Sequence, residues 1–221
     1  MAVFAPIMAM RRIIRPVTVA YADHTYDATN LTTYTFSARA LGGGAKKNVL
    51  AIGGGSLSRT ISSVTVDGGA ANYIDSMVWA TPEGTLEFWQ IDGVSATTGD
   101  IVVTWSGGQL RCSIGVFAVY NAAALASDTP SVATASGNPS VSVSVPANGA
   151  AIGAVINNAA SSSFAWSGLT EAYDATTGGE SMSFSGAALA VTAADPSLSV
   201  TVTPSTSQDN GLMVVSFGPV T

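Results

Sequence analysis

The stretch Ser140–Val145 reads SVSVSV and alternates strictly between serine and valine. A later stretch, residues 198–203, reads LSVTVT and repeats this alternation with threonine among its hydroxyl side chains. Successive side chains of a β-strand point to opposite faces of the sheet. Each stretch is therefore predicted to be a strand that buries its aliphatic side chains and exposes its hydroxyl groups.

Three other segments are apolar at every position instead of every second one: residues 49–52, 116–120 and 212–215. Such strands are predicted to be central, with both of their faces covered. Short strand signals recur along the chain between turns rich in Gly, Asp and Pro. No stretch shows a sustained helical periodicity, and residues 121–127 alone favour a helical turn.

These signals together predict an all-β protein, a two-sheet antiparallel sandwich of the jelly-roll type. The Cys–Trp–Cys spacing of an immunoglobulin domain is missing, because Cys112 is the only cysteine. No linker-like stretch divides the chain into two parts. We therefore expect residues 17–221 to form a single β-sandwich domain, preceded by an extended N-terminal arm, residues 1–16.

The charges are few and unevenly distributed. Asp, Glu, Lys and Arg make up 10% of the 221 residues, against about 25% in an ordinary soluble domain. Residues 1–59 hold seven basic and two acidic residues, a net charge of +5, and residues 60–221 hold one basic and twelve acidic residues, a net charge of −11. An acidic body repels phosphate groups, so we expect no direct contact with nucleic acid.

Residues 1–10 are almost entirely apolar, and Arg11, Arg12 and Arg15 follow them. A secretory signal has the opposite order, and an apolar run of this length that contains Pro6 is too short to span a bilayer. We therefore expect no signal peptide and no membrane insertion. The arm is predicted to dock on a partner, unless its arginines are simply solvated. Its candidate contact residues are Phe4, Ile7, Met8, Arg11, Arg12 and Arg15.

The sequence offers little for catalysis. His24 is the only histidine, which excludes the usual His-rich metal site within one chain. It lies in a polar segment that predicts a surface loop, and no Gly-x-Ser-x-Gly motif accompanies it. Cys112 lies in an apolar strand pattern that is typical of a buried, unreactive thiol. We predict a protein that is not an enzyme, with no catalytic residue, no cofactor and no metal ligand.

Two further segments and one tryptophan are candidates for binding phosphate, Ca²⁺ or a glycan. Residues 42–47, GGGAKK, lack the spacing of a phosphate-binding loop and predict a flexible basic hairpin loop. Residues 174–180 could bend around Ca²⁺ but match no EF-hand spacing. Trp166 lies in a loop-rich region and is predicted to be exposed, whereas the three earlier tryptophans fit a core. A glycan would be contacted by Trp166, Tyr173 and Asp174.

One ordered series of segments is similar to a known group of proteins. The segments are YTFS at 34–37, LG at 41–42, NVLAIG at 48–53, ISSVTVDG at 61–68, LEFW at 86–89, TGDIVVTWS at 98–106 and IGVFAVYN at 114–121. This series resembles small β-sandwich (jelly-roll) structural proteins of tailed bacteriophages, prophages and gene-transfer-agent-like particles. The segments hold no reactive residues, so the resemblance implies a fold and a setting but no site residue.

The resemblance implies a virion component: a capsid decoration or cement protein, a spike, or a receptor-contacting module. We therefore expect a non-enzymatic structural protein on the outer surface of a phage virion, made in the host cytoplasm. Its arm would dock on the major capsid protein, on another virion protein, or on a neighbouring copy in a homo-oligomer. The alternative is a carbohydrate-binding module for host adsorption, whose partner is a glycan of the host surface.

Overall fold

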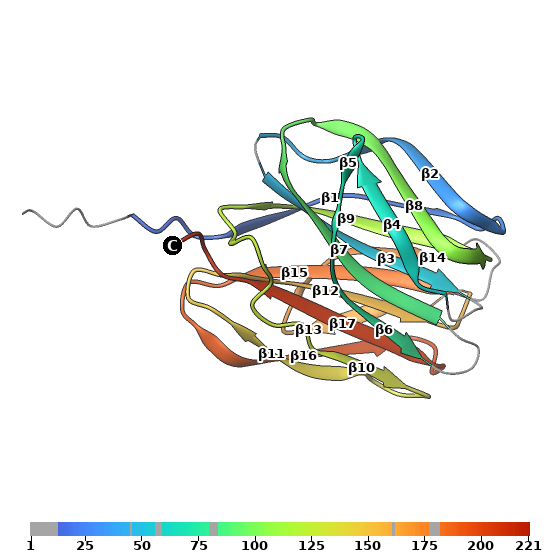
Figure 1. Ribbon diagram of the computed structural model, residues 1–221. Coiled ribbons are helices and arrows are strands. Elements are labelled where there is room, and N and C mark those ends of the chain that lie inside the picture. Colours follow the sequence, from blue (N-terminus) through green and yellow to red (C-terminus); the bar gives the residue numbers. More distant parts are fainter. Residues whose placement is uncertain (1–12, 45, 56–58, 80–83, 161, 177–181) are drawn as a thin grey trace, which may run out of the picture.

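Figure 1 shows the computed structural model, which describes residues 13–44, 46–55, 59–79, 84–160, 162–176 and 182–221. Within these residues the regular elements are strands alone, and every pair of neighbouring strands is antiparallel. The prediction of an all-β antiparallel sandwich is confirmed. The described strands form four sheets, however, where the sequence predicted two.

The first half of the chain forms two of these sheets. The first inner sheet has the strand order β1 (Thr18–Asp27), β9 (Cys112–Tyr120), β3 (Lys46–Gly55), β7 (Gly84–Val94) and β6 (Asn72–Trp79). The first outer sheet has the order β2 (Leu31–Ala40), β8 (Thr98–Gln109), β4 (Ile61–Val66) and β5 (Gly69–Ala70). Strands that follow one another along the chain mostly alternate between the two sheets, which is the connectivity of a jelly roll.

The second half of the chain repeats this arrangement. The second inner sheet has the order β10 (Ser131–Thr134), β17 (Asn210–Phe217), β12 (Ala150–Asn157), β15 (Ser183–Ala190) and β14 (Thr170–Thr176). The second outer sheet has the order β11 (Ser140–Val145), β16 (Asp195–Pro204) and β13 (Phe164–Ser167). Each of these strands has a counterpart at the same place in the first half, and β5 alone lacks one among the described residues. The chain therefore forms two jelly rolls of one topology in tandem.

The four sheets lie in layers (Figure 1), and three clusters of buried hydrophobic residues lie between them. The central cluster lies between the two inner sheets and includes Phe88 from the first and Phe184 from the second. The other two clusters fill the interiors of the jelly rolls, around Trp105 in the first and Val200 in the second. The two jelly rolls thus pack inner sheet against inner sheet and share the central cluster.

The strand β3 shows why the layers number four. Val49 and Ala51 lie in the central cluster, whereas Leu50 and Ile52 lie in the cluster of the first jelly roll. Both faces of the strand are therefore covered, as its composition predicts. A strand of a two-sheet sandwich has a core on one face only, so the fully apolar segments require additional layers.

The segment that connects the two jelly rolls contains bends and no helical turn, so the prediction of a helical turn at residues 121–127 is wrong. Its backbone groups bond to the C-terminal part of the chain. The N–H of Ala123 donates to the carbonyl of Gly218 at 2.8 Å, and the N–H of Ser127 donates to the carbonyl of Ser216 at 2.7 Å. These donors are consequently engaged outside the segment and do not form the local bonds of a helix.

Hydrogen bonds at Pro16 and Val17 hold the described start of the chain to the body, and residues 13–16 are exposed. Val17 is buried, and its N–H donates to the carbonyl of Asn148 at 2.8 Å. The carbonyl of Pro16 accepts a hydrogen bond from Asn121 Nδ2 at 3.0 Å. Residues 13–16 then lead away from the body, beside the C-terminus (Figure 1). We call residues 13–17 the arm base.

Candidate functional site

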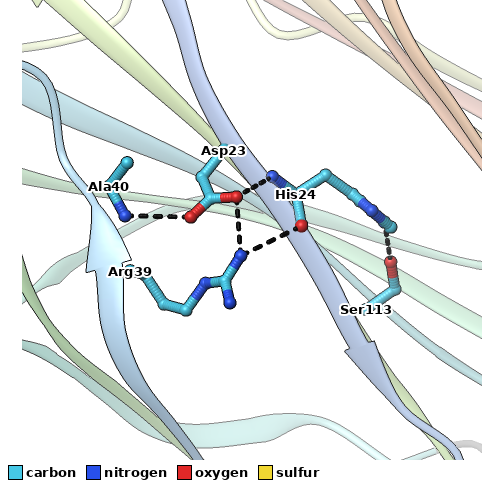
Figure 2. A network of polar contacts seen from close by, with 5 residues as sticks. All are labelled: Asp23, His24, Arg39, Ala40 and Ser113. Atoms are coloured by element: carbon cyan, nitrogen blue, oxygen red, sulfur yellow. Dashed lines mark hydrogen bonds and ion pairs between the residues drawn. The ribbon is translucent and has the colours of Figure 1, made fainter.

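A polar network surrounds Asp23 and His24 on β1 (Figure 2). A β-bulge at Ala22 shifts the register of β1 against β9. The extra residue turns Tyr21 and His24 to the same face of the sheet, where both rings stack on Tyr173 of β14, at centroid distances of 5.5 and 4.6 Å. The bulge therefore builds an aromatic contact between the two jelly rolls, and we call this contact of three rings the seam.

Asp23 connects the first inner sheet to the first outer sheet (Figure 2). Its Oδ1 accepts hydrogen bonds from Arg39 Nη2 at 2.6 Å and from the N–H of His24 at 2.8 Å. Its Oδ2 accepts one from the N–H of Ala40 at 2.9 Å. The Arg39 and Asp23 side chains are 27% and 19% exposed. This partly shielded pair therefore fixes the position of β1 beside β2.

His24 contacts Ser113 on the other side of β1, with 2.9 Å between Nε2 and Oγ (Figure 2). Burial lowers the pKa of His24 to about 4, so the ring is neutral at neutral pH. The prediction of a surface loop for His24 is wrong, because the bulged strand turns the ring inward. Nothing in the sequence pattern points to Ser113 as its partner, because 89 residues separate the two.

The His24–Ser113 pair resembles part of a catalytic triad but differs from one in two respects. A triad has a carboxylate on Nδ1 of the histidine, whereas the Asp23 carboxylate bonds to Arg39 and to main-chain N–H groups. The nucleophile of a triad must reach its substrate, and Ser113 is only 2% exposed. The geometry fits a structural hydrogen bond better than a nucleophile with its base.

Tyr173 fills a slot that two glycines leave open. A Cβ atom on Gly115 would lie 2.2 Å from Tyr173 Oη, and one on Gly186 would lie 2.3 Å from Tyr173 Cε1. Any larger residue at either position would collide with the ring. Burial also raises the pKa of Tyr173. The slot thus holds the ring of the second jelly roll against the first.

The three residues predicted to contact a glycan do not share one cleft. Trp166 lies on β13, where its Nε1 donates to Ser185 Oγ at 2.8 Å and its ring packs against the core of the second jelly roll. Tyr173 lies on the opposite face of the second inner sheet, in the seam. Asp174 accepts a hydrogen bond on Oδ2 from the main chain at the start of β13, at 3.0 Å. Trp166 is half-buried because Gly153 leaves room for its ring.

The arm base contains the one described residue among the six predicted arm contacts. Arg15 is exposed and lines a cavity of about 180 Å³ with Ile13, Asn121 and Val220. A second cavity of about 250 Å³ adjoins the first at Asn121 and Val220. We call it the lysine cavity; its other lining residues are Lys46, Lys47, Asp92, Gly93, Val119 and Ala122. The other five predicted contacts, Phe4, Ile7, Met8, Arg11 and Arg12, lie outside the described residues.

The two lysines are buried on β3, so the prediction of a flexible basic loop is wrong for them. Lys46 Nζ donates to the carbonyls of Gly44, Val94 and Ala96 at 3.0–3.3 Å. Burial lowers the pKa of Lys46. Lys47 Nζ lies 2.7 Å from Asp92 Oδ1, 2.8 Å from Gln90 Oε1 and 3.0 Å from the carbonyl of Ala124. Acceptors from distant segments thus hold both ammonium groups.

Glu87 and Cys112 are further ionisable residues that are buried in the described structure. Glu87 is 1% exposed, and its carboxylate accepts hydrogen bonds from the N–H of Ile61 and from Trp89 Nε1, both at 2.8 Å. Burial raises its pKa. Cys112 is fully buried, and burial raises the pKa of its thiol.

The described residues contain no group of three or more His, Cys, Asp or Glu placed to hold a metal ion. Most of the candidate calcium loop, residues 174–180, lies outside the described residues.

Comparisons of the chain with protein-family models, curated protein sequences and solved structures give no match. The resemblance to phage structural proteins therefore stays a prediction. In the described part of the chain no helix is long and apolar enough to cross a membrane.

Proposed function

We propose that the protein is a non-enzymatic structural component of a tailed-phage virion, of the capsid decoration, cement or spike kind. It lies on the outer surface of the particle and attaches through its N-terminal arm to the major capsid protein, to another virion protein or to a neighbouring copy of the chain. The observation that carries this proposal is the exposure of apolar side chains on the described part of the arm: Ile13 is 86% exposed and Ile14 is 47% exposed. Clustered large apolar side chains in water favour a partner that covers them.

The outer sheets support a structural role, because hydroxyl side chains far outnumber charged ones on their strands. Ser140 Oγ of β11 lies 2.8 Å from Thr201 Oγ1 of β16. At the corresponding place in the first jelly roll, Thr33 Oγ1 of β2 lies 3.4 Å from Thr104 Oγ1 of β8. Hydroxyl-rich, strand-paired surfaces of this kind suit a durable particle component better than a site for a charged substrate.

The proposal is tested on particles from the natural source of the chain. We expect mass spectrometry of gradient-purified particles to detect the protein, and antibodies to label it on intact particles. A variant that lacks residues 1–12 should unfold at the same temperature as the full-length chain but no longer attach to particles. Recovery of the chain only from the soluble fraction, or unchanged attachment of the shortened variant, would contradict the proposal.

A second proposal is a carbohydrate-binding module for host adsorption, favoured by two exposed rings at and beside the seam. Tyr21 is 44% exposed and Tyr26 is 39% exposed on β1. The face of an exposed aromatic ring can stack on a sugar. On a glycan array, Tyr26→Ala should lose binding, while Tyr73→Ala on β6, where the side chain is 51% exposed, should retain it. An array without signal for the full-length protein would remove this candidate.

A further inference from the structure

The arm base directs the chain outward from a fixed point. Pro16 and Val17 are held to the body by Asn121 and Asn148. Residues 13–16 lead away from the body (Figure 1), and Ile13 is 86% exposed. Twelve residues precede Ile13, and nine of the first ten are Met, Ala, Val, Phe or Ile. This apolar segment therefore starts from a point that already faces away from its own body.

The lysine cavity lies beside that point and fits an apolar side chain. Its volume is about 250 Å³, and an apolar cavity of about 150 Å³ already holds a benzene ring. Val119, Ala122 and Val220 supply aliphatic walls. The ammonium groups of Lys46 and Lys47 are bonded to protein acceptors, so the cavity needs no anion to balance them.

We infer that the arm of one copy docks in the lysine cavity of a second copy of this chain. This inference rests on the proposed structural role and names the neighbouring copy as a partner of the arm. Phe4 lies nine positions before Ile13, a distance of at most about 30 Å along an extended chain, which is enough to cross to a neighbour in contact. Two copies that exchange arms reciprocally form a closed dimer with twofold symmetry.

The distribution of charge favours this partner. Arg11, Arg12 and Arg15 give the arm three positive charges, whereas residues 60–221 have a net charge of −11. The arm of one copy is therefore attracted to the body of another, although the two acidic bodies repel each other. A basic, apolar arm is the part of the chain that is best suited to join such bodies.

Two full-length variants test the exchange. The cavity variant is Val220→Asp; Val220 is 52% exposed, so the fold should accept the change. Its matched control is Val78→Asp on β6, where the side chain is 50% exposed. The arm variant changes Phe4, Ile7 and Met8 to Asp. In sedimentation experiments we expect the wild type and the control to dimerise, and each test variant to dimerise at least about tenfold more weakly. A buried carboxylate is costly beside the aliphatic walls of the cavity, because Lys46 and Lys47 are already bonded to protein acceptors.

A mixture of the two variants tests whether the arm and the cavity bind each other. The cavity variant has an intact arm, and the arm variant has an intact cavity. If arms are exchanged, the mixture forms a heterodimer through the one interface that remains. If the wild type dimerises but the mixture stays monomeric, the arm and the cavity do not bind each other, and that result would overturn the inference.

The remaining outcomes separate this inference from the proposed function. A wild-type protein that stays monomeric to about 100 μM, far above the Kd range of specific complexes, overturns the exchange. So does a dimer that neither variant weakens. If the arm variant nevertheless loses attachment to particles, the structural role stands with a different partner. If dimers form by exchange while particle attachment is unaffected, the proposed use of the arm on the shell fails instead.

Discussion

Tyr173 occupies a space that Gly115 and Gly186 leave open on facing sheets. We predict that Gly115→Ala displaces the ring and weakens the stack with His24, because the new Cβ would lie 2.2 Å from Tyr173 Oη. The expected loss of unfolding free energy is about 1–3 kcal/mol, typical of overpacking. Urea denaturation measures it, with Gly43→Ala as the control, since nothing lies within 4 Å of a Cβ there.

A second background tests whether the effect of Gly115→Ala comes from its collision with the Tyr173 ring. In a Tyr173→Ala background the ring is gone, so Gly115→Ala should cost much less than in the wild type. An equal cost in both backgrounds would mean that the substitution acts elsewhere.

His24 makes the stability of the protein depend on pH. Burial lowers its pKa in the folded chain from 6.5 to about 4. Between these values the unfolded chain binds the proton and the folded chain does not, so the stabilising contribution is present above pH 6.5 and is lost as the pH falls toward 4. The full loss is about 3 kcal/mol. Denaturation at pH 7 and pH 4.5 should therefore show a larger loss for the wild type than for His24→Gln; equal losses would argue against a buried neutral ring.

Lys47 connects three separate elements: β3, β7 and the segment between the jelly rolls. Its Nζ bonds to Gln90 and to the carbonyl of Ala124, and it pairs with Asp92. We predict that Lys47→Met lowers the unfolding free energy by about 2–4 kcal/mol, because buried acceptors lose their donor.

A substitution of Asp92, the ion-pair partner of Lys47, serves as the comparison for Lys47→Met. Its side chain is 54% exposed, so water can replace the lost contact and Asp92→Asn should cost less than about 1 kcal/mol. Thermal unfolding of both variants checks the difference. Similar effects of the two substitutions would mean that the ion pair, and not the buried hydrogen bonds, carries the role of Lys47.

Patterns within one element were the part that sequence could predict. The alternation in Ser140–Val145 places Val143 and Val145 inside and its serines outside, as expected. The burial of Lys46 and Lys47 could not be predicted, because it depends on carbonyl groups of β7 and of residue 124, which lie far along the chain. The partial burial of Trp166 could not be predicted for the same reason, because Gly153 on another sheet leaves the space for its ring.

At the scale of the whole molecule, the sequence contained a signal for more than two layers. Residues 49–52 and 212–215 are apolar on both faces, and each contributes to two different clusters. Strands of that kind cannot belong to a two-sheet sandwich with one core. The tandem repetition itself could not be predicted, because corresponding strands, such as β7 (GTLEFWQIDGV) and β15 (SFSGAALA), differ in most of their residues.

The shared central cluster leads us to predict that the two jelly rolls unfold together. Separating them would expose apolar side chains from both inner sheets, including Phe88 and Phe184, which are 0% and 3% exposed. Calorimetry should therefore show a single transition, with equal calorimetric and van't Hoff enthalpies. Phe184→Ala should lower the stability of the entire chain by about 3–5 kcal/mol without splitting the transition. Two transitions, of which only one shifts in the variant, would show instead that each jelly roll is stable without the other.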